Sequence, residues 1–135
     1  MFGLSMLKHR RILKQAFSDC FLPLKDELGN VPIAMHTSKF ITASILGTCR
    51  AYEEKQHIKE SNFDLLVDAV FEEIFRKESV KIQVQTEYWL HDADSDFLQY
   101  YYMAKSKTNS GSDLSWLQYS ALENFKQSHT IIFPL

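Results

Sequence analysis

The sequence has few of the residues that build disulfide frameworks, zinc sites and phosphate-binding loops. Its 135 residues include only two cysteines, Cys20 and Cys49, with no CxxC motif and no histidine nearby at zinc-binding spacing. With four glycines, it lacks the Gly-rich loops that cradle phosphates, and it has no G-x-S-x-G nucleophile motif. We therefore expect two reduced, buried cysteines in a cytoplasmic protein and no cofactor.

Long apolar runs and a strong charge excess are also missing. No segment approaches the ~20 apolar residues of a membrane-spanning helix. Basic residues between Lys8 and Lys14 interrupt the N-terminal region, where a cleaved signal would need an unbroken apolar stretch. The formal net charge of −2 argues against a dedicated nucleic-acid binder, which usually carries a basic excess.

What the chain does contain is enough apolar material for one core. Hydrophobic residues make up 45% and aromatic residues 13% of the sequence, so residues 1–135 are expected to form a single domain. The strongest pattern is at residues 61–77, where apolar side chains recur at helical spacing over about half of the helix circumference. They are Phe63, Leu66, Val67, Val70, Phe71, Ile74 and Phe75. We expect this helix to be central, with neighbours on several sides.

Other segments also show helical periodicity. A helix over residues 3–22 should end at Pro23, and a second should begin at Pro32 and run to about residue 56. Small residues on the inner side of the second helix allow close approach of a neighbouring helix, or leave room for a small apolar ligand beside Phe40, Ser44 and Gly47. We favour close packing. Further helices are predicted around residues 97–104 and 113–128.

Residues 79–90 are ambiguous. Val80, Ile82 and Val84 alternate with polar residues, as in a half-buried strand. We favour a helix over 80–90 with Val84, Tyr88 and Trp89 on its inner face, because no strong partner strand is present. The alternative is a two-stranded ribbon of residues 80–86 with 130–133. The predicted fold is all-α, a single irregular bundle of five to six helices.

Aromatic residues exceed what a small core needs. Three consecutive tyrosines, Tyr100, Tyr101 and Tyr102, cannot all face one core, because helical neighbours point about 100° apart. Trp116 and Tyr119 lie off the apolar stripe of the last predicted helix, and Ile132 and Phe133 belong to an apolar C-terminal tail. Because no convincing catalytic set is found, the favoured hypothesis is a non-enzymatic protein–protein interaction module. Its expected partner is a second copy of the chain, as a homodimer, or another protein.

Acidic residues suggest an alternative. Asp92, Asp94 and Asp96 match the opening of a calcium loop, but Phe97 stands where that loop needs glycine. Helix capping explains these aspartates more simply. If Glu73 joined them, the cluster would resemble the carboxylate set of a Mg²⁺- or Mn²⁺-dependent phosphohydrolase. The sequence leaves this second hypothesis open.

A third hypothesis rests on the first predicted helix. No acidic residue precedes Asp19, and four basic residues are grouped near the N-terminus: Lys8, Arg10, Arg11 and Lys14. Such a basic helix is compatible with contact to an anionic membrane surface or to nucleic acid. The simpler interpretation is the solvated face of a bundle helix.

Overall fold

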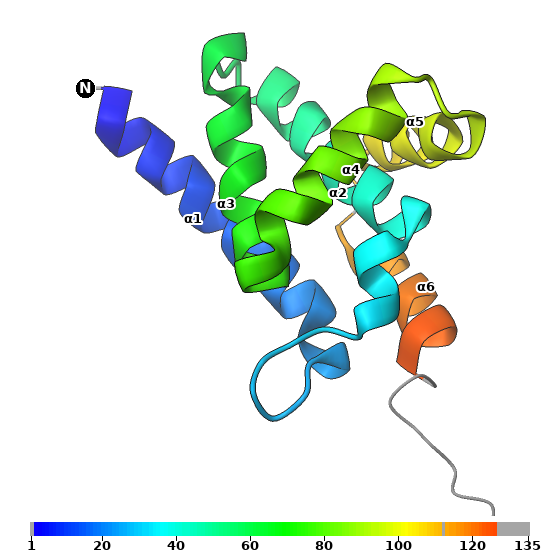
Figure 1. Cartoon of the computed structure of the whole chain (residues 1–135). Coiled ribbons are helices and arrows are strands. Elements are labelled where there is room, and N and C mark those ends of the chain that lie inside the picture. Colours follow the sequence, from blue (N-terminus) through cyan, green and yellow to red (C-terminus); the bar gives the residue numbers. More distant parts are fainter. Residues whose placement is uncertain (1, 112, 127–135) are drawn as a thin grey trace, which may run out of the picture.

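The chain folds into α-helices joined by short 3₁₀ turns (Figure 1). The computed structural model describes residues 2–111 and 113–126, and no strand occurs within them. The α-helices are α1 (Phe2–Phe21), α2 (Lys39–Lys55), α3 (Phe63–Phe75), α4 (Ser79–His91), α5 (Ser95–Asn109) and α6 (Ser115–Phe125). The 3₁₀ turns are η1 (Leu22–Leu24), η2 (Ile33–Thr37), η3 (Glu60–Asn62) and η4 (Arg76–Glu78). The predicted all-α bundle is confirmed.

Helix α2 is the most completely buried element. Every residue from 41 to 49 is buried, including the polar Thr42, Ser44 and Thr48. Its main neighbour is α5, whereas α3 packs against α1, α2 and α4. The expectation that α3 has neighbours on several sides is therefore correct, but α2 shares the centre with it. The central position of α2 is hard to predict from the sequence, because its small polar residues weaken the apolar pattern expected of a helix that is buried all round.

Close packing between α2 and α5 depends on Gly47. A Cβ atom at this position would collide with the backbone carbonyl of Tyr101 and would lie 3.1 Å from the Cβ of Ala104. The neighbouring helix thus occupies the space where the sequence left room for a small ligand. Glycine costs about 1 kcal/mol relative to alanine inside a helix, and the close approach of the two backbones offsets that cost.

Two predicted helix boundaries are wrong. Pro32 starts no α-helix, because residues 33–37 form η2 and α2 begins only after Ser38. The Ser38 hydroxyl accepts a hydrogen bond from the backbone N–H of Ile41 at 3.1 Å, which is a regular N-cap. Helix α5 runs on to Asn109 through residues expected to form a loop from Lys105.

Residues 79–91 form helix α4, which confirms the helix favoured over 80–90. The alternative ribbon does not form over 80–86, and residues 130–133 lie outside the described residues. The predicted inner face is only partly correct, because Trp89 packs against the core but its two companions do not. Ile82 and Thr86 are buried one turn apart, whereas Val84 and Tyr88 are exposed. The alternating apolar residues of this segment therefore belong to opposite faces of one helix.

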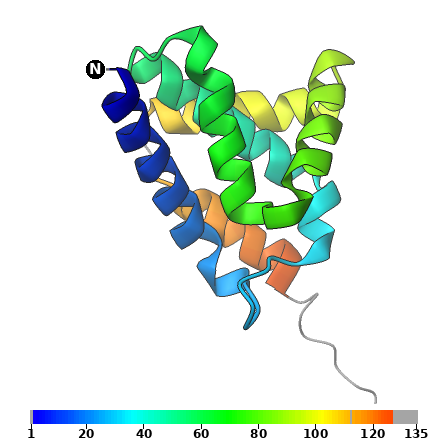
Figure 2. The ribbon, with the colours of Figure 1, turned by 60° about the vertical axis from the view of Figure 1, so that its left-hand side comes forward.

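Helices α3 and α4 form a corner and diverge from it (Figure 2). Arg76, the first residue of η4, makes the corner with φ 56° and ψ −124°. Residues other than glycine rarely adopt this conformation. The 61–77 segment is accordingly divided into η3, α3 and η4 instead of forming one continuous helix.

Candidate functional site

Four basic residues line one hollow between α1 and the α3–α4 corner, although the guanidinium of Arg76 lies against Gly29. We call this hollow the basic cavity, and its volume is about 690 Å³. Its lining residues are Arg10, Lys14, Ala69, Glu72, Glu73, Arg76, Lys77, Ser79 and Val80. The cavity thus joins basic residues of α1 to basic residues more than sixty positions later in the chain.

Helix α1 supplies Arg10 and Lys14 because its buried face packs against α3. Leu13 and Phe17 are buried on α1, and α1 is in contact with α3. Residues four apart share one side of a helix. Arg10 and Lys14 therefore stand together at the edge of this packed face, both half-buried. Long basic side chains commonly bury their aliphatic stems in this way and keep the charge near solvent.

The corner between α3 and α4 supplies the other two cations. The left-handed conformation of Arg76 ends α3 abruptly and puts η4, with Lys77, beside α1. Ser79, the first residue of α4, is buried in the wall of the cavity. The positive end of the α4 dipole therefore lies at the same place as the basic side chains.

The charges of the basic cavity are not balanced by close ion pairs. In residues 2–111 and 113–126, the salt bridges join Lys39 to Asp94, Arg50 to Glu53 and Glu60, and Lys105 to Glu54. None of them involves a residue of this cavity. Its two carboxylates, Glu72 and Glu73, face four cations.

Arg10 carries the clearest sign of a missing partner. Its Nε atom is buried and has no hydrogen-bond acceptor in the described part of the chain. A buried donor without an acceptor costs about 1–3 kcal/mol, and such groups are rare in folded proteins.

The basic residues predicted from the sequence are divided by the fold. Lys8 and Arg11 are exposed and are not part of the cavity, whereas Arg10 and Lys14 line it. The sequence pointed to none of the cavity residues after α3. The Arg76–Lys77 pair directly after an apolar helix was the available signal, but its position beside α1 depends on the tertiary fold.

The predicted metal candidates do not come together. Glu73 lines the basic cavity, whereas Asp94 caps α5 and accepts hydrogen bonds from the Phe97 N–H at 3.0 Å and from Lys39 Nζ at 2.7 Å. The hydrogen bond from Lys39, followed by that from Phe97, lowers the pKa of Asp94 below its ordinary value. Asp92 and Asp96 are exposed. Across the described residues, no three His, Cys, Asp or Glu side chains are grouped so that they could hold a metal ion.

The predicted aromatic surface is only partly exposed. Tyr101 is buried in the core and is no longer an interface candidate, and Tyr100 is half-buried with its ring edge-on to Phe40. Trp116 is also half-buried, while Tyr102 and Tyr119 expose 59% and 65% of their surface. The remaining candidates, Ile132 and Phe133, lie outside the described residues.

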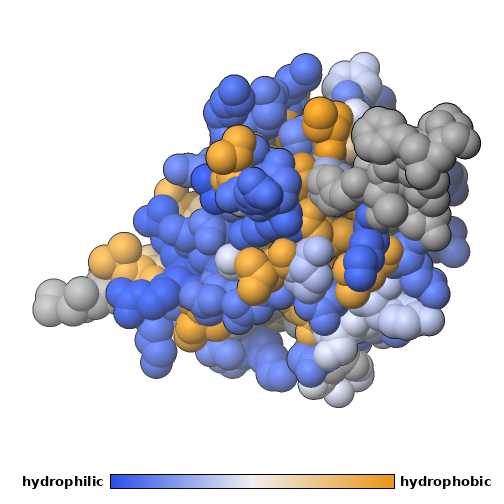
Figure 3. All heavy atoms as spheres, turned by 90° about the horizontal axis from the view of Figure 1, so that it is seen from below, coloured by the Kyte–Doolittle hydropathy of each residue, from blue (hydrophilic) through white to orange (hydrophobic). Residues whose placement is uncertain are grey.

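A different apolar surface lies on α4. Val80, Val84 and Tyr88 follow one another at one-turn intervals and expose 68%, 61% and 63% of their surface. Figure 3 shows one face of the molecule, on which apolar residues are scattered among hydrophilic ones. We call the three α4 residues the α4 stripe.

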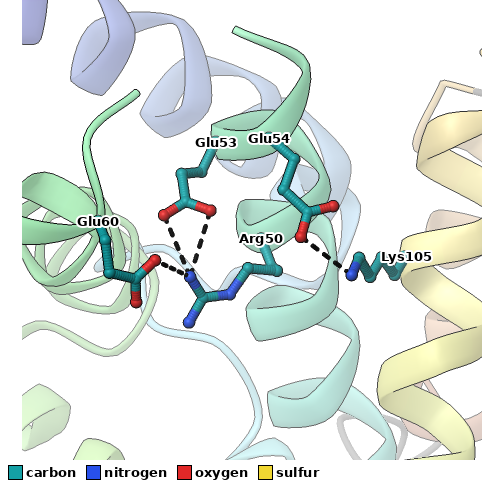
Figure 4. Close-up of polar contacts among 5 residues, drawn as sticks. All are labelled: Arg50, Glu53, Glu54, Glu60 and Lys105. Carbon is teal, nitrogen blue, oxygen red and sulfur yellow. Dashed lines mark hydrogen bonds and ion pairs between the residues drawn. The ribbon is translucent and has the colours of Figure 1, made fainter. Parts of the chain in front are cut away.

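Arg50 on α2 forms a second charged cluster, which holds the connector between α2 and α3 (Figure 4). Its Nη1 donates to Glu53 Oε2 at 3.1 Å and to Glu60 Oε2 at 2.6 Å, and its guanidinium lies 3.6 Å from the centre of the Phe63 ring. Beside this cluster, Lys105 of α5 pairs with Glu54 at 3.0 Å. The arrangement fixes η3 and the start of α3 against α2.

The two carboxylates of this cluster differ in their protonation. Burial, together with a hydrogen bond to Glu60, raises the pKa of Glu53, and Arg50 opposes this rise. The hydrogen bond to Glu53, followed by that from Arg50, lowers the pKa of the exposed Glu60. Glu53 is thus the carboxyl that holds its proton more strongly. The cluster has a sufficient structural explanation as a clamp on the connector.

Comparisons with known proteins give no functional assignment. The chain matches no protein-family model, no curated protein and no solved structure. Within the described residues, every helix is too short or too polar to cross a membrane. The functional argument therefore rests on the geometry of the sites.

Proposed function

We propose that this domain binds a small ligand that carries a phosphate group, or a chemically similar anion, in the basic cavity. The observation that supports this is that Arg10, Lys14, Arg76 and Lys77 line one cavity and form no salt bridge within the described residues. Arginine presents several donors in a planar fork that suits phosphate oxygens, and lysine adds a mobile charge.

The size and surroundings of the cavity favour a small ligand over a nucleic acid. A volume of about 690 Å³ falls in the range typical of small-molecule sites. The net charge of −2 opposes the approach of a long polyanion, because a nucleic acid contacts charge well beyond one cavity. The basic α1 helix thus contributes to anion binding through two of its four basic residues.

Calorimetric titration with inorganic phosphate and pyrophosphate at low salt tests the proposal. We expect binding that weakens as salt is added, because exposed charges are screened. Substitution Arg10→Gln or Lys14→Gln should weaken pyrophosphate binding about tenfold, since charge-assisted hydrogen bonds contribute about 1.5–3 kcal/mol each. Lys8→Gln and Arg11→Gln are matched controls on the same helix and outside the cavity. Absence of binding, or equal losses in the control variants, would overturn the proposal.

A second candidate function is self-association through the α4 stripe, in keeping with the interaction module expected from the sequence. The supporting observation is that Val80, Val84 and Tyr88 are exposed on one side of α4, where a second copy would cover them. Three side chains cover much less than the ~800 Å² per partner of a stable interface. The expected dimer is therefore weak and dependent on concentration.

Light scattering over a range of protein concentrations tests this second function. We expect a rising mean mass for the unsubstituted chain and a constant monomer mass for Val84→Glu. Tyr102→Ser is the control, because Tyr102 is equally exposed on another helix. A strict monomer at millimolar concentration, or an equal loss of self-association in the control variant, argues against the α4 stripe as the dimer interface.

A further inference from the structure

A second cleft is lined by residues of α2, α3 and α4, of which α3 and α4 diverge from their common corner (Figure 2). Its volume is about 250 Å³, and we call it the α3–α4 cleft. It shares no lining residue with the basic cavity. Its apolar lining comes from all three helices: Leu46 of α2, Phe63, Val67 and Phe71 of α3, and Leu90 of α4.

Hydrogen bonds within the protein brace the walls of this cleft. Gln83 Nε2 on α4 donates to Asp68 Oδ1 on α3 at 3.1 Å, which holds the two helices together. The hydroxyl of Thr86 donates to the carbonyl of Ile82 at 2.7 Å. Since that donor is already used inside the helix, the interior of the cleft selects an apolar group.

The charged residues around the cleft are predominantly acidic. Glu60, Asp64 and Glu87 are exposed lining residues. The basic lining residue is Arg50, whose charge is already engaged by Glu60 and the buried Glu53. Arg50 also stacks on Phe63. The mouth of the cleft therefore attracts a positive charge while its interior receives an apolar group.

From this arrangement we propose that the α3–α4 cleft binds a small amphiphilic cation, which has an aromatic or branched apolar body and an amine. The amine faces Asp64 and Glu87, and the apolar body contacts Val67 and Phe71. An apolar cavity of about 150 Å³ is large enough for benzene. A volume of about 250 Å³ accordingly suits a body of two fused rings, such as indole.

Three ligands with the same ring system and different charge provide the test. Tryptamine is cationic at neutral pH, indole is neutral, and indole-3-acetate is anionic. We expect NMR titration to give the tightest binding for tryptamine, about tenfold weaker binding for indole, and the weakest for indole-3-acetate. Chemical-shift changes should centre on residues 63–71 and 83–90. If indole-3-acetate binds best, Arg50 is the anchor and the proposed charge preference is wrong.

Variants separate the two parts of the proposal. Glu87→Gln should weaken tryptamine binding about threefold and leave indole unchanged, because it removes one surface charge contact. Val67→Phe should reduce binding of both ligands by filling the cleft, and Glu27→Gln, in an exposed loop, is the control. If Val67→Phe does not fold, the Glu87→Gln comparison still decides the question of charge. No binding of tryptamine or indole at 10 mM, or equal effects of Glu87→Gln and Glu27→Gln, would overturn the inference.

Discussion

The backbone carbonyl of Tyr101 on α5 lies directly against Gly47 on α2, with no room between them for a side chain. This relationship sets the distance between the two helices at the centre of the bundle. It also predicts the effect of the smallest possible substitution. The obstacle is backbone, which cannot move aside as a flexible side chain can.

Gly47→Ala should therefore destabilise the domain although alanine is the better helix former. Overpacking of a rigid core costs about 3 kcal/mol at the upper end, and the gain in helix propensity is about 1 kcal/mol. We expect a net loss of about 2 kcal/mol in the free energy of unfolding, measured in urea by circular dichroism. Ser106→Ala, at an exposed position of α5, should change stability by less than about 0.5 kcal/mol. Equal stability of the Gly47 variant and the unsubstituted protein would contradict the close approach.

Removal of Arg50 should leave the buried carboxyl of Glu53 without its cation. Loss of one partner of a buried pair costs about 3 kcal/mol, so Arg50→Met should lower stability by about that amount at pH 7. Adding Glu53→Gln should restore much of the loss, because the uncompensated charge is then gone. A double variant as unstable as Arg50→Met alone would exclude this explanation.

The Arg50→Met variant should also change the pH dependence of stability. Burial already raises the pKa of Glu53 in the folded state, and Arg50 opposes the rise. Without Arg50 the pKa of Glu53 rises further, so protonation of this carboxyl favours the folded state as the pH falls. The loss of stability should be largest at pH 7 and shrink as the pH falls toward 4. Urea unfolding at both pH values provides the measurement.

The contribution of Asp94 to stability should depend on pH in the opposite sense to that of Glu53 in the Arg50→Met variant. The folded-state pKa of Asp94 is lowered by Lys39 and by the Phe97 N–H. Its contribution to stability is therefore present above the ordinary pKa of an aspartate and is lost as the pH falls through the lower folded-state value. Asp94→Asn should keep the cap but lose the pair with Lys39, and it should flatten the acid limb of the stability curve below about pH 4. Asp96→Asn, in the first turn of the same helix, is the control; an equal change in that variant would contradict a specific role for Asp94.

Both cysteines should be inert in the native protein. Cys20 and Cys49 are free and buried, and burial raises the pKa of each thiol to about 12. Only the thiolate reacts with alkylating or disulfide reagents. We expect negligible labelling by Ellman's reagent at pH 8 in buffer and complete labelling of both in 8 M urea. Rapid labelling of either residue under native conditions would show that the helices around it open.

The sequence predicts the helices better than it predicts the site. Apolar periodicity identified α3 because its buried side chains are large. It also indicated the helix that contains α2 but not the burial of α2 on all sides, because Thr42, Ser44 and Thr48 are buried polar residues. Half of the basic cavity was anticipated, since Arg10 and Lys14 are close together in the sequence. The other half depends on Arg76, a non-glycine residue at positive φ, which local propensity argues against. Tertiary packing decides that turn, and the turn creates the cavity.

Strain at Arg76 offers a direct test of how stability and binding are related. Its φ of 56° and ψ of −124° cost about 1–3 kcal/mol for a residue with a side chain, whereas glycine adopts them freely. Arg76→Gly should raise the free energy of unfolding by about 1 kcal/mol and weaken pyrophosphate binding about tenfold. Ala93→Gly, which also replaces a residue at positive φ (54°), should leave pyrophosphate binding unchanged. If Arg76→Gly neither stabilises the domain nor weakens pyrophosphate binding, two claims are wrong: that Arg76 strains the turn, and that its side chain helps to bind the anion.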